Sequence, residues 1–396
     1  MKNNSQISED YVDGILDSII EVRRDIHAHP ETGFEEYRTS NLVKEKLEAL
    51  GYVVHSGIAK TGLVAVLQGE AGDGLMIGLR ADLDALYIHE ANEKTYASTC
   101  SGKMHACGHD GHTAMLLGAA TYFAKHRNFK GKICFIFQPA EEGLGGAKQM
   151  IEEGVLEKFP CDQIYAMHNM PGVPAGFFAI ANGLMTAASD TWEVKFFGTG
   201  GHGSSPQKNT DVTVVGGQFI SALQSIVSRS VDPLEGAVIS IGYIQAGNEN
   251  TPNVIPAEFK MRGTARSYNR KISEIFEQRM KTLAENIADA YKCRAEVKYQ
   301  RLFPALFNDH HCFENAVQAA SQVVGKENVK IIPRPGTGSE DFAFFLEKIP
   351  GAYIVIGNGV DAEHAHDIHT PHYDFNDAII KEGILYFINL IYTINR

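Results

Sequence analysis

Strand-length apolar runs alternate with helical patterns along most of this chain, and a block in the middle breaks the alternation. Outside that block, the runs with the length of buried strands lie at 63–67, 75–79, 133–137, 164–167 and 353–356. Segments with apolar residues at helical spacing lie at 10–28, 36–50, 112–126, 145–153, 312–323 and 376–394. This alternation is typical of an α/β sheet that helices cover on both faces.

The middle block reads in the order strand, helix, strand, strand, helix, strand. Its elements are expected near 192–196, 211–229, 236–244, 257–266, 272–287 and 295–299. A βαββαβ order is that of a ferredoxin-like α+β unit, which is complete in itself. The sequence therefore predicts a domain formed by residues 1–187 and 304–396, with a second domain inserted over 188–303.

Composition limits the class of protein and its partners. A length of 396 residues favours two domains, and 44% hydrophobic with 21% charged residues is typical of a globular protein. A net charge of -12 argues against nucleic acid or an anionic membrane as a partner. The N-terminus is polar, no apolar run has the length of a membrane span, and the six cysteines show no paired spacing. We therefore expect a cytoplasmic protein with reduced thiols.

Three imidazoles, a thiol and a carboxylate lie within the nine residues Met104–His112. Such side chains are ligands of borderline-soft divalent metals. Cys107 and His109 are two residues apart, so in an extended segment both would point to the same side. Gly108 and Gly111 permit the tight backbone of such a corner. The run therefore predicts part of a metal site.

Further candidate ligands follow apolar runs downstream. Glu141 and Glu142 follow the run at 133–137, and His168 and His369 also lie just after strand-like segments. A structural zinc site would have its ligands in a short knuckle, whereas these candidates span residues 107–369. The spacing therefore favours a site assembled by the fold.

These motifs together resemble the M20 family of metallopeptidases in its amidohydrolase branch, which includes aminoacylases, hippurate hydrolases and auxin-conjugate hydrolases. The matching stretches are Arg24–Glu31, Gly78–Leu86, Met104–His112, Gln138–Gly143, Met167–Asn169, Gly200–Pro206, Asn253–Pro256 and His369–Pro371. The resemblance covers essentially the whole chain. It implies a mixed-sheet α/β catalytic domain with an inserted ferredoxin-like α+β lid and dimerisation domain.

The resemblance also implies two divalent metal ions per subunit, which activate a water for attack on an amide carbonyl. It places Cys107 between the two ions, His109 and His168 on one of them, and Glu142 and His369 on the other. A thiolate favours zinc, while the Glu and His ligands also suit manganese. The other histidines of these motifs are interpreted as outside the ligand set or, for His27 and His29, as structural.

Two carboxylates are expected to assist the metals. Glu141 matches the general base of the family, which takes a proton from water and returns it to the leaving amine. Asp84 matches the carboxylate that hydrogen-bonds a metal ligand from behind. The alternative for the glutamate pair is a solvated acidic turn.

In the inserted domain, the resemblance implies that His202 reaches the active site of a partner subunit and stabilises the oxyanion. It likewise assigns Asn253 and Arg266 to substrate binding, and a guanidinium can bind both oxygens of a carboxylate. The alternatives are a turn residue for His202 and a solvated strand edge for Arg266. The loop 336–342 is either near the substrate or only the start of a helix.

We therefore expect an amidohydrolase that cleaves the acyl amide of N-acyl amino acids. Hippurate-like N-benzoyl glycine is the favoured substrate, and N-acetyl amino acids are also compatible. A dipeptidase would need an acidic anchor for a free substrate amine, which the sequence does not show. A non-catalytic metal-binding protein is disfavoured because Glu141 accompanies the ligands. A homodimer or a dimer of dimers is expected.

Overall fold

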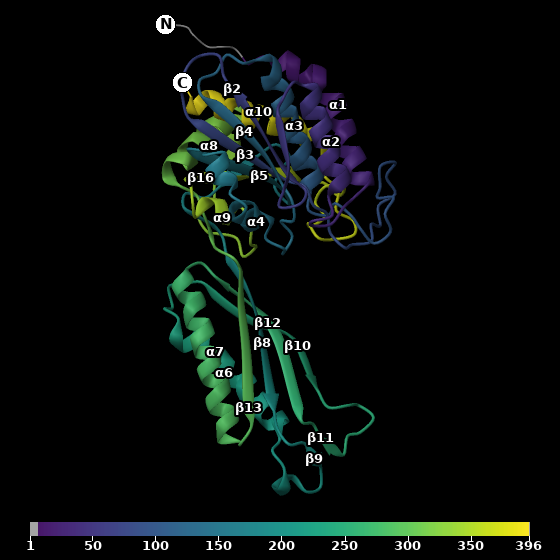
Figure 1. Cartoon of the computed structure of the whole chain (residues 1–396), viewed down its shortest axis with the longest axis vertical. Coiled ribbons are helices and arrows are strands. Elements are labelled where there is room, and N and C mark those ends of the chain that lie inside the picture. Colours follow the sequence, from purple (N-terminus) through teal and green to yellow (C-terminus); the bar gives the residue numbers. More distant parts are fainter. Residues whose placement is uncertain (1–6, 396) are drawn as a thin grey trace. The chain divides into compact units, whose positions relative to one another are not determined.

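The computed structural model describes residues 7–395, and the first six residues of the polar N-terminus lie outside that range. The chain divides into two compact units (Figure 1). The α/β unit comprises Met1–Met185, Phe307–Pro335 and Asp341–Arg396, and the inserted unit comprises Thr186–Leu306 and Gly336–Glu340. Each unit has its own hydrophobic core.

The α/β unit is built on an eight-stranded sheet in the order β1-β2-β4-β3-β5-β16-β6-β15. Its strands are β1 (Val54–Ile58), β2 (Gly62–Gln68), β4 (Lys132–Gln138), β3 (Met76–Asp82), β5 (Gln163–Pro171), β16 (Gly351–Gly359), β6 (Phe178–Ile180) and β15 (Val329–Ile331). β3 is parallel to both β4 and β5, whereas β2 is antiparallel to β4. The sheet is therefore mixed, as predicted.

The helices of this unit are α1 (Glu9–Ala28), α2 (Tyr37–Ala49), α3 (His109–Lys125), α4 (Gly146–Glu152), α5 (Val155–Lys158), α8 (His310–Val324), α9 (Ala343–Leu346) and α10 (Ile380–Ile394). α3 contacts α1, α10 and β3, which explains why almost every residue of its first four turns is buried. No helix in the described range 7–395 is long and apolar enough to cross a membrane.

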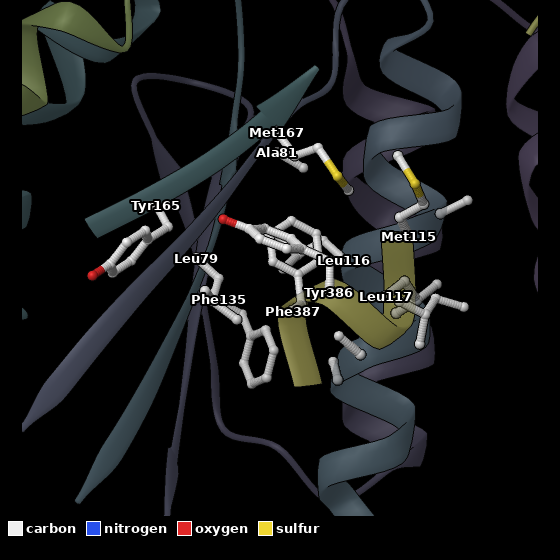
Figure 2. Packing of buried hydrophobic residues seen from close by; sticks show 14 of the residues in the cluster. Leu79, Ala81, Met115, Leu116, Leu117, Phe135, Tyr165, Met167, Tyr386 and Phe387 are labelled. Atoms are coloured by element: carbon white, nitrogen blue, oxygen red, sulfur yellow. The ribbon is translucent and has the colours of Figure 1, made fainter. Parts of the chain in front are cut away.

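The core between sheet and helices is aromatic and aliphatic. Figure 2 shows Leu79 and Phe135 on strands, Met115 on α3, and Tyr386 and Phe387 on α10, all within one cluster. Burial of both sheet faces explains why the strands read as continuous apolar runs in the sequence rather than as alternating ones. Because α3 is buried in this core, its first residues are fixed at the sheet edge.

The predicted start of this helix was wrong. The sequence pattern placed it at 112, whereas α3 begins at His109. Gly108 adopts a left-handed conformation with φ 92°, and a Cβ there would lie 2.2 Å from Asn169 Oδ1. This glycine turns the chain sharply, so the helix can begin directly after Cys107.

The inserted unit has the predicted ferredoxin-like order. Its main elements are β8 (Ala188–Phe197), α6 (Val212–Ser230), β10 (Ala237–Ala246), β12 (Glu258–Ser267), α7 (Arg270–Ala290) and β13 (Arg294–Phe303). The strands pair antiparallel in the order β10-β12-β8-β13. Val194, Phe196 and Met261 lie on one face of this sheet in a core with Phe219 of α6 and Phe276 of α7.

The division between the units differs from the predicted bounds. The sequence placed it at 187–188 and 303–304, and the structure places it at 185–186 and 306–307. The segment Gly336–Glu340, which was expected in the α/β domain, belongs to the inserted unit. The reason is backbone pairing, because Thr186 forms a parallel bridge with Gly336 and Ala187 N donates to Gly338 O at 3.0 Å.

A buried ionic cluster joins α1 to the start of α3. His27 Nδ1 lies 2.8 Å from Asp110 Oδ2, and its Nε2 lies 3.2 Å from Glu90 Oε1. Arg23, one turn earlier, contacts the same Asp110 oxygen at 3.4 Å. The interpretation of His27 as structural fits these contacts, which join α1 to α3 and to Glu90.

We predict that this cluster makes stability depend on pH. Burial alone would lower the pKa of His27, but the Asp110 and Glu90 carboxylates outweigh burial and the opposing charge of Arg23, and they raise the pKa from 6.5 to about 9. The stabilisation is therefore complete below pH 6.5 and is lost as the pH rises through 9. Wild type should lose about 3 kcal/mol of unfolding free energy over this range relative to His27→Gln.

Chemical denaturation of both proteins between pH 6 and 9.5 measures this difference. If the difference in unfolding free energy between wild type and variant stays constant with pH, His27 is not charged in the folded protein.

Candidate active site

The candidate residues gather where parallel strands end. β3, β4 and β5 are neighbours in the sheet, and their carboxyl ends lie at the same edge. Asp84 follows β3, Glu141 and Glu142 follow β4, and His168 lies on β5. This edge of an open α/β sheet is where ligand sites form, since the loops that follow the strands converge there.

Five expected ligands come together at this edge. Donor atoms of Cys107, His109 and His168 lie within 4.8 Å of one another, and so do those of Cys107, Glu142 and His369. Cys107 Sγ is 3.3 Å from His168 Nε2, and His369 Nε2 is 3.0 Å from Glu142 Oε1. Cys107 thus belongs to both groups.

His369 is brought in from the C-terminal part of the chain. It adopts a left-handed backbone conformation, with φ 63°, and its N–H donates to Ala106 O at 2.7 Å. Such a conformation is uncommon for a residue with a side chain and marks a constrained position. The hydrogen bond ties the backbone of His369 to the loop that carries Cys107.

Two atoms of the cluster are suited to a cation. Within the described residues, the buried His109 Nε2 and Glu142 Oε1 have no hydrogen-bond partner, although the glutamate oxygen is close to His369. A buried polar atom without a partner costs about 1–3 kcal/mol. The soft and hard donors together suit zinc or manganese, so the residues present fit a divalent metal.

The charges at the site lead to the same conclusion. Burial raises the pKa of the Cys107 thiol well above its usual range, and the carboxylates of Glu142 and Glu141 raise it further. Burial alone would lower the pKa of His109, but Asp82 and Asp84 outweigh it and raise the value to about 10. The shift of His109 expresses an excess of buried negative charge, which a divalent cation would offset, and carboxylates also add to the effect of burial on Cys107.

Asp84 organises the site from behind. Its Oδ1 accepts from Glu141 N at 3.1 Å and lies 3.2 Å from His109 Nδ1, while its Oδ2 accepts from Glu142 N at 3.0 Å. A proton on Nδ1 leaves the His109 Nε2 lone pair free for a metal. One carboxylate therefore orients a candidate ligand and also the turn that carries both glutamates.

Glu141 lies beside the ligand cluster. Its side chain is 7% exposed, and one of its oxygens accepts from Asp341 N at 3.3 Å. Ligand atoms of Glu141, Glu142 and His109 lie within 4.8 Å of one another. A solvated acidic turn is inconsistent with this burial.

Several residues of the site escaped the sequence interpretation. His112, expected outside the ligand set, is fixed between Asp82 Oδ1 at 2.6 Å and Asn169 Oδ1 at 2.8 Å, and its ring centroid is 4.4 Å from that of His168. It therefore packs directly behind a candidate ligand. The sequence did contain a signal for this role: polar residues follow one another at the start of α3, directly before its apolar residues.

A second polar network lies under the glutamate turn. The fully buried Arg80 donates to Asp82 at 2.7 Å, to Gln138 at 2.8 Å and to Asp341 at 3.1 Å. Asp341 Oδ2 also accepts from Ala147 N at 2.9 Å. The loop 336–342 thus does more than begin the short helix α9, since the Asp341 carboxylate holds the start of α4 and the Asp341 N–H donates to the Glu141 carboxylate.

The inserted unit brings two of its three expected residues together. His202 on β9 (Gly201–His202) pairs with Val254 on β11 (Val254–Ile255), and Gly203 N donates to Asn253 O at 2.8 Å. His202 is exposed. Arg266 lies on β12 in the four-stranded sheet, where its guanidinium donates to Ala265 O at 3.1 Å.

Comparison with known proteins identifies relatives of this chain. A model of peptidase family M20/M25/M40 matches residues 78–393. Hippurate hydrolase from Campylobacter jejuni is 40% identical over 369 residues, which cover 93% of this chain and 94% of that protein. N-acetylcysteine deacetylase from Bacillus subtilis is 38% identical over 375 residues, which cover 94% and 95%.

A solved structure supports the fold. The YxeP protein of Bacillus subtilis, described as a dinuclear metal binding peptidase of the M20 family, matches with a TM-score of 0.82 at 33% identity and covers 97% of this chain and 99% of that chain. The predicted fold class is thereby confirmed, as is the resemblance that the motifs indicated. This chain belongs to peptidase family M20/M25/M40.

Proposed function

We propose that this protein is a dinuclear metal-dependent amidohydrolase that cleaves the acyl amide of N-acyl amino acids, with hippurate-like N-benzoyl glycine as the favoured substrate. The observation that carries the proposal is a pair of donor groups that share Cys107, with Glu141 buried beside them. Two relatives are called hippurate hydrolase and N-acetylcysteine deacetylase, and both names describe N-acyl amino acids as substrates.

The two ions would be held by the five clustered residues, of which Cys107 belongs to both donor groups. Zinc is favoured by the thiolate, and manganese is the alternative. When bound, the ions would supply Lewis acidity that polarises the amide carbonyl and increases the acidity of water. The shared thiol would need to lose its proton, which the charge of the ions favours.

Glu141 transfers the proton between the attacking water and the leaving nitrogen. Glu141 accepts a proton from the attacking water as the new bond to the acyl carbon forms. As the bond between the acyl carbon and nitrogen breaks, Glu141 returns this proton to the nitrogen, so a carboxylic acid and a free amino acid leave. The N–H of Asp341 donates to the Glu141 carboxylate, and the Asp84 carboxylate accepts from Glu141 N–H, so both contacts keep Glu141 in place.

The inserted unit would contribute the remaining interactions. We propose that His202 donates a hydrogen bond to the oxyanion in the active site of a partner subunit. Asn253, beside His202, and Arg266 would bind the substrate, with the guanidinium on its carboxylate. The protein would then act as a homodimer or a dimer of dimers.

A substrate panel tests the function. We expect the zinc-loaded or manganese-loaded protein to release the amino acid from N-benzoyl and N-acetyl amino acids, fastest from hippurate, when amine release is measured. The same protein after chelation is the control and should be inactive. Higher kcat/KM for free dipeptides than for every N-acyl amino acid would contradict the proposal.

The Glu141→Gln variant tests the general base. We expect both metals and the substrate affinity to be retained while kcat falls by about 10² to 10⁴, since the amide keeps the shape but cannot accept the proton. Cys107→Ser is the contrasting variant, because it should lose metal together with activity. Metal loss in Glu141→Gln would instead show that Glu141 is itself a ligand.

Mixed dimers test the role of His202. Homodimers of Glu141→Ala and of His202→Ala should each be nearly inactive, whereas a mixed dimer would regain a single complete site. Random pairing makes about half of the dimers mixed, so activity should recover to about a quarter of wild type.

Subunits are exchanged by mild unfolding and refolding, and each variant treated alone is the control. If differential tags confirm mixed dimers but activity does not recover, His202 does not act in the site of its partner.

A further inference from the structure

The turn that carries both glutamates has a constrained backbone. Ala140, directly before Glu141, is fully buried and adopts φ 54°. This left-handed conformation is uncommon for a residue with a side chain and persists only when the surroundings impose it. The carbonyl of Ala140 accepts from Gly146 N at 3.0 Å, which fixes the C-terminal side of this residue.

The other side is fixed by a buried glutamate from a distant part of the chain. Glu36 Oε1 accepts from Ala140 N at 2.8 Å, and Glu36 Oε2 accepts from the Thr61 hydroxyl at 2.6 Å. Glu36 lies at the N-terminal end of α2 and is fully buried. Both of its oxygens therefore have hydrogen-bond partners, and one partner is the backbone next to Glu141.

The segment that leads to Glu36 packs against the same part of the site. Thr32 forms a bridge with Ala85, directly after Asp84, and Ala85 N donates to Glu31 O at 2.8 Å. A Cβ on Gly33 would lie 3.0 Å from the Cβ of Ala140, so the backbone of this segment lies directly on the turn. Residues 31–36 thus contact both the Asp84 strand end and the glutamate turn.

From these contacts we propose that Glu36 is a positioning residue, which holds Ala140 in its left-handed conformation and thereby places Glu141 for proton transfer. The inference rests on the proposed function, in which Glu141 is the general base. Glu36 acts through the backbone and needs no contact with substrate or metal.

The role requires an acceptor oxygen within reach rather than a charge. Burial raises the pKa of Glu36 to about 7, and the charge of Asp84 contributes in the same direction. The neutral carboxyl is therefore accessible near neutral pH. A glutamine at this position keeps the acceptor oxygen at the same reach, whereas an aspartate keeps the charge but retracts the oxygens by about 1.5 Å.

The matched variants Glu36→Gln and Glu36→Asp separate the two properties. We expect Glu36→Gln to keep kcat within about two-fold of wild type and Glu36→Asp to lower kcat at least ten-fold, since a displacement of about 1 Å in a catalytic group can cost up to 10²-fold. KM for the N-acyl amino acid and the metal bound per chain, measured by atomic absorption, should stay unchanged in both.

Two control variants distinguish the positioning of Glu141 from a general loss of packing around Glu36. Thr61→Val removes the second hydrogen bond of Glu36 but leaves the turn untouched, and Glu35→Gln changes the exposed neighbour that contacts Thr32 and Lys103. Both should keep kcat within about two-fold of wild type.

The inference is overturned if Glu36→Asp retains full kcat, if Glu36→Gln loses as much as Glu36→Asp, if either variant loses metal, or if Thr61→Val lowers kcat equally. Absence of N-acyl amino acid hydrolysis by the wild type would instead overturn the proposed function, and this inference with it.

Discussion

Negative charge buried at one edge of the sheet determines which partners the side chains of the candidate site need. Asp82 and Asp84 are nearly inaccessible to solvent, Glu141 is 7% exposed, and Arg80 is the buried cation bound to Asp82. Buried carboxylates are tolerated only when they are paired, hydrogen-bonded or bound to metal. Here the arrangement leaves His109 Nε2 and Glu142 Oε1 without a hydrogen-bond partner among the described residues, which is the state that divalent cations would relieve.

The same carboxylates organise the backbone. Asp84 accepts from the peptides of Glu141 and Glu142, Glu36 accepts from Ala140 N, and Asp341 accepts from Ala147 N. Each of these acceptors comes from a different part of the chain, so the glutamate turn is fixed from several sides. A left-handed alanine can be maintained there because the surrounding hydrogen bonds outweigh its conformational cost. The buried carboxylates therefore supply the negative charge of the site and also fix the backbone of the glutamate turn.

Much of the fold could be predicted from local pattern. Both faces of the central strands are buried, so strands such as β4 and β16 appear as apolar runs, and the alternation in β8 predicted its half-exposed sheet. The candidate ligands were found because Cys107 and His109 form a dense motif. Glu36 was missed, and Asp341 was included only in a loop whose role stayed open, because their roles come from contacts with distant residues and the sequence does not show that a carboxylate is buried. The start of α3 was missed because it depends on the backbone of Gly108.

The proposed function requires two metal ions that share Cys107. Anomalous diffraction from crystals grown with zinc, and separately with manganese, tests it most directly. We expect two anomalous peaks, one at Cys107, His109 and His168 and the other at Cys107, Glu142 and His369, with the sulfur about 2.3 Å from zinc. A single peak, or peaks that do not contact Cys107, would contradict it.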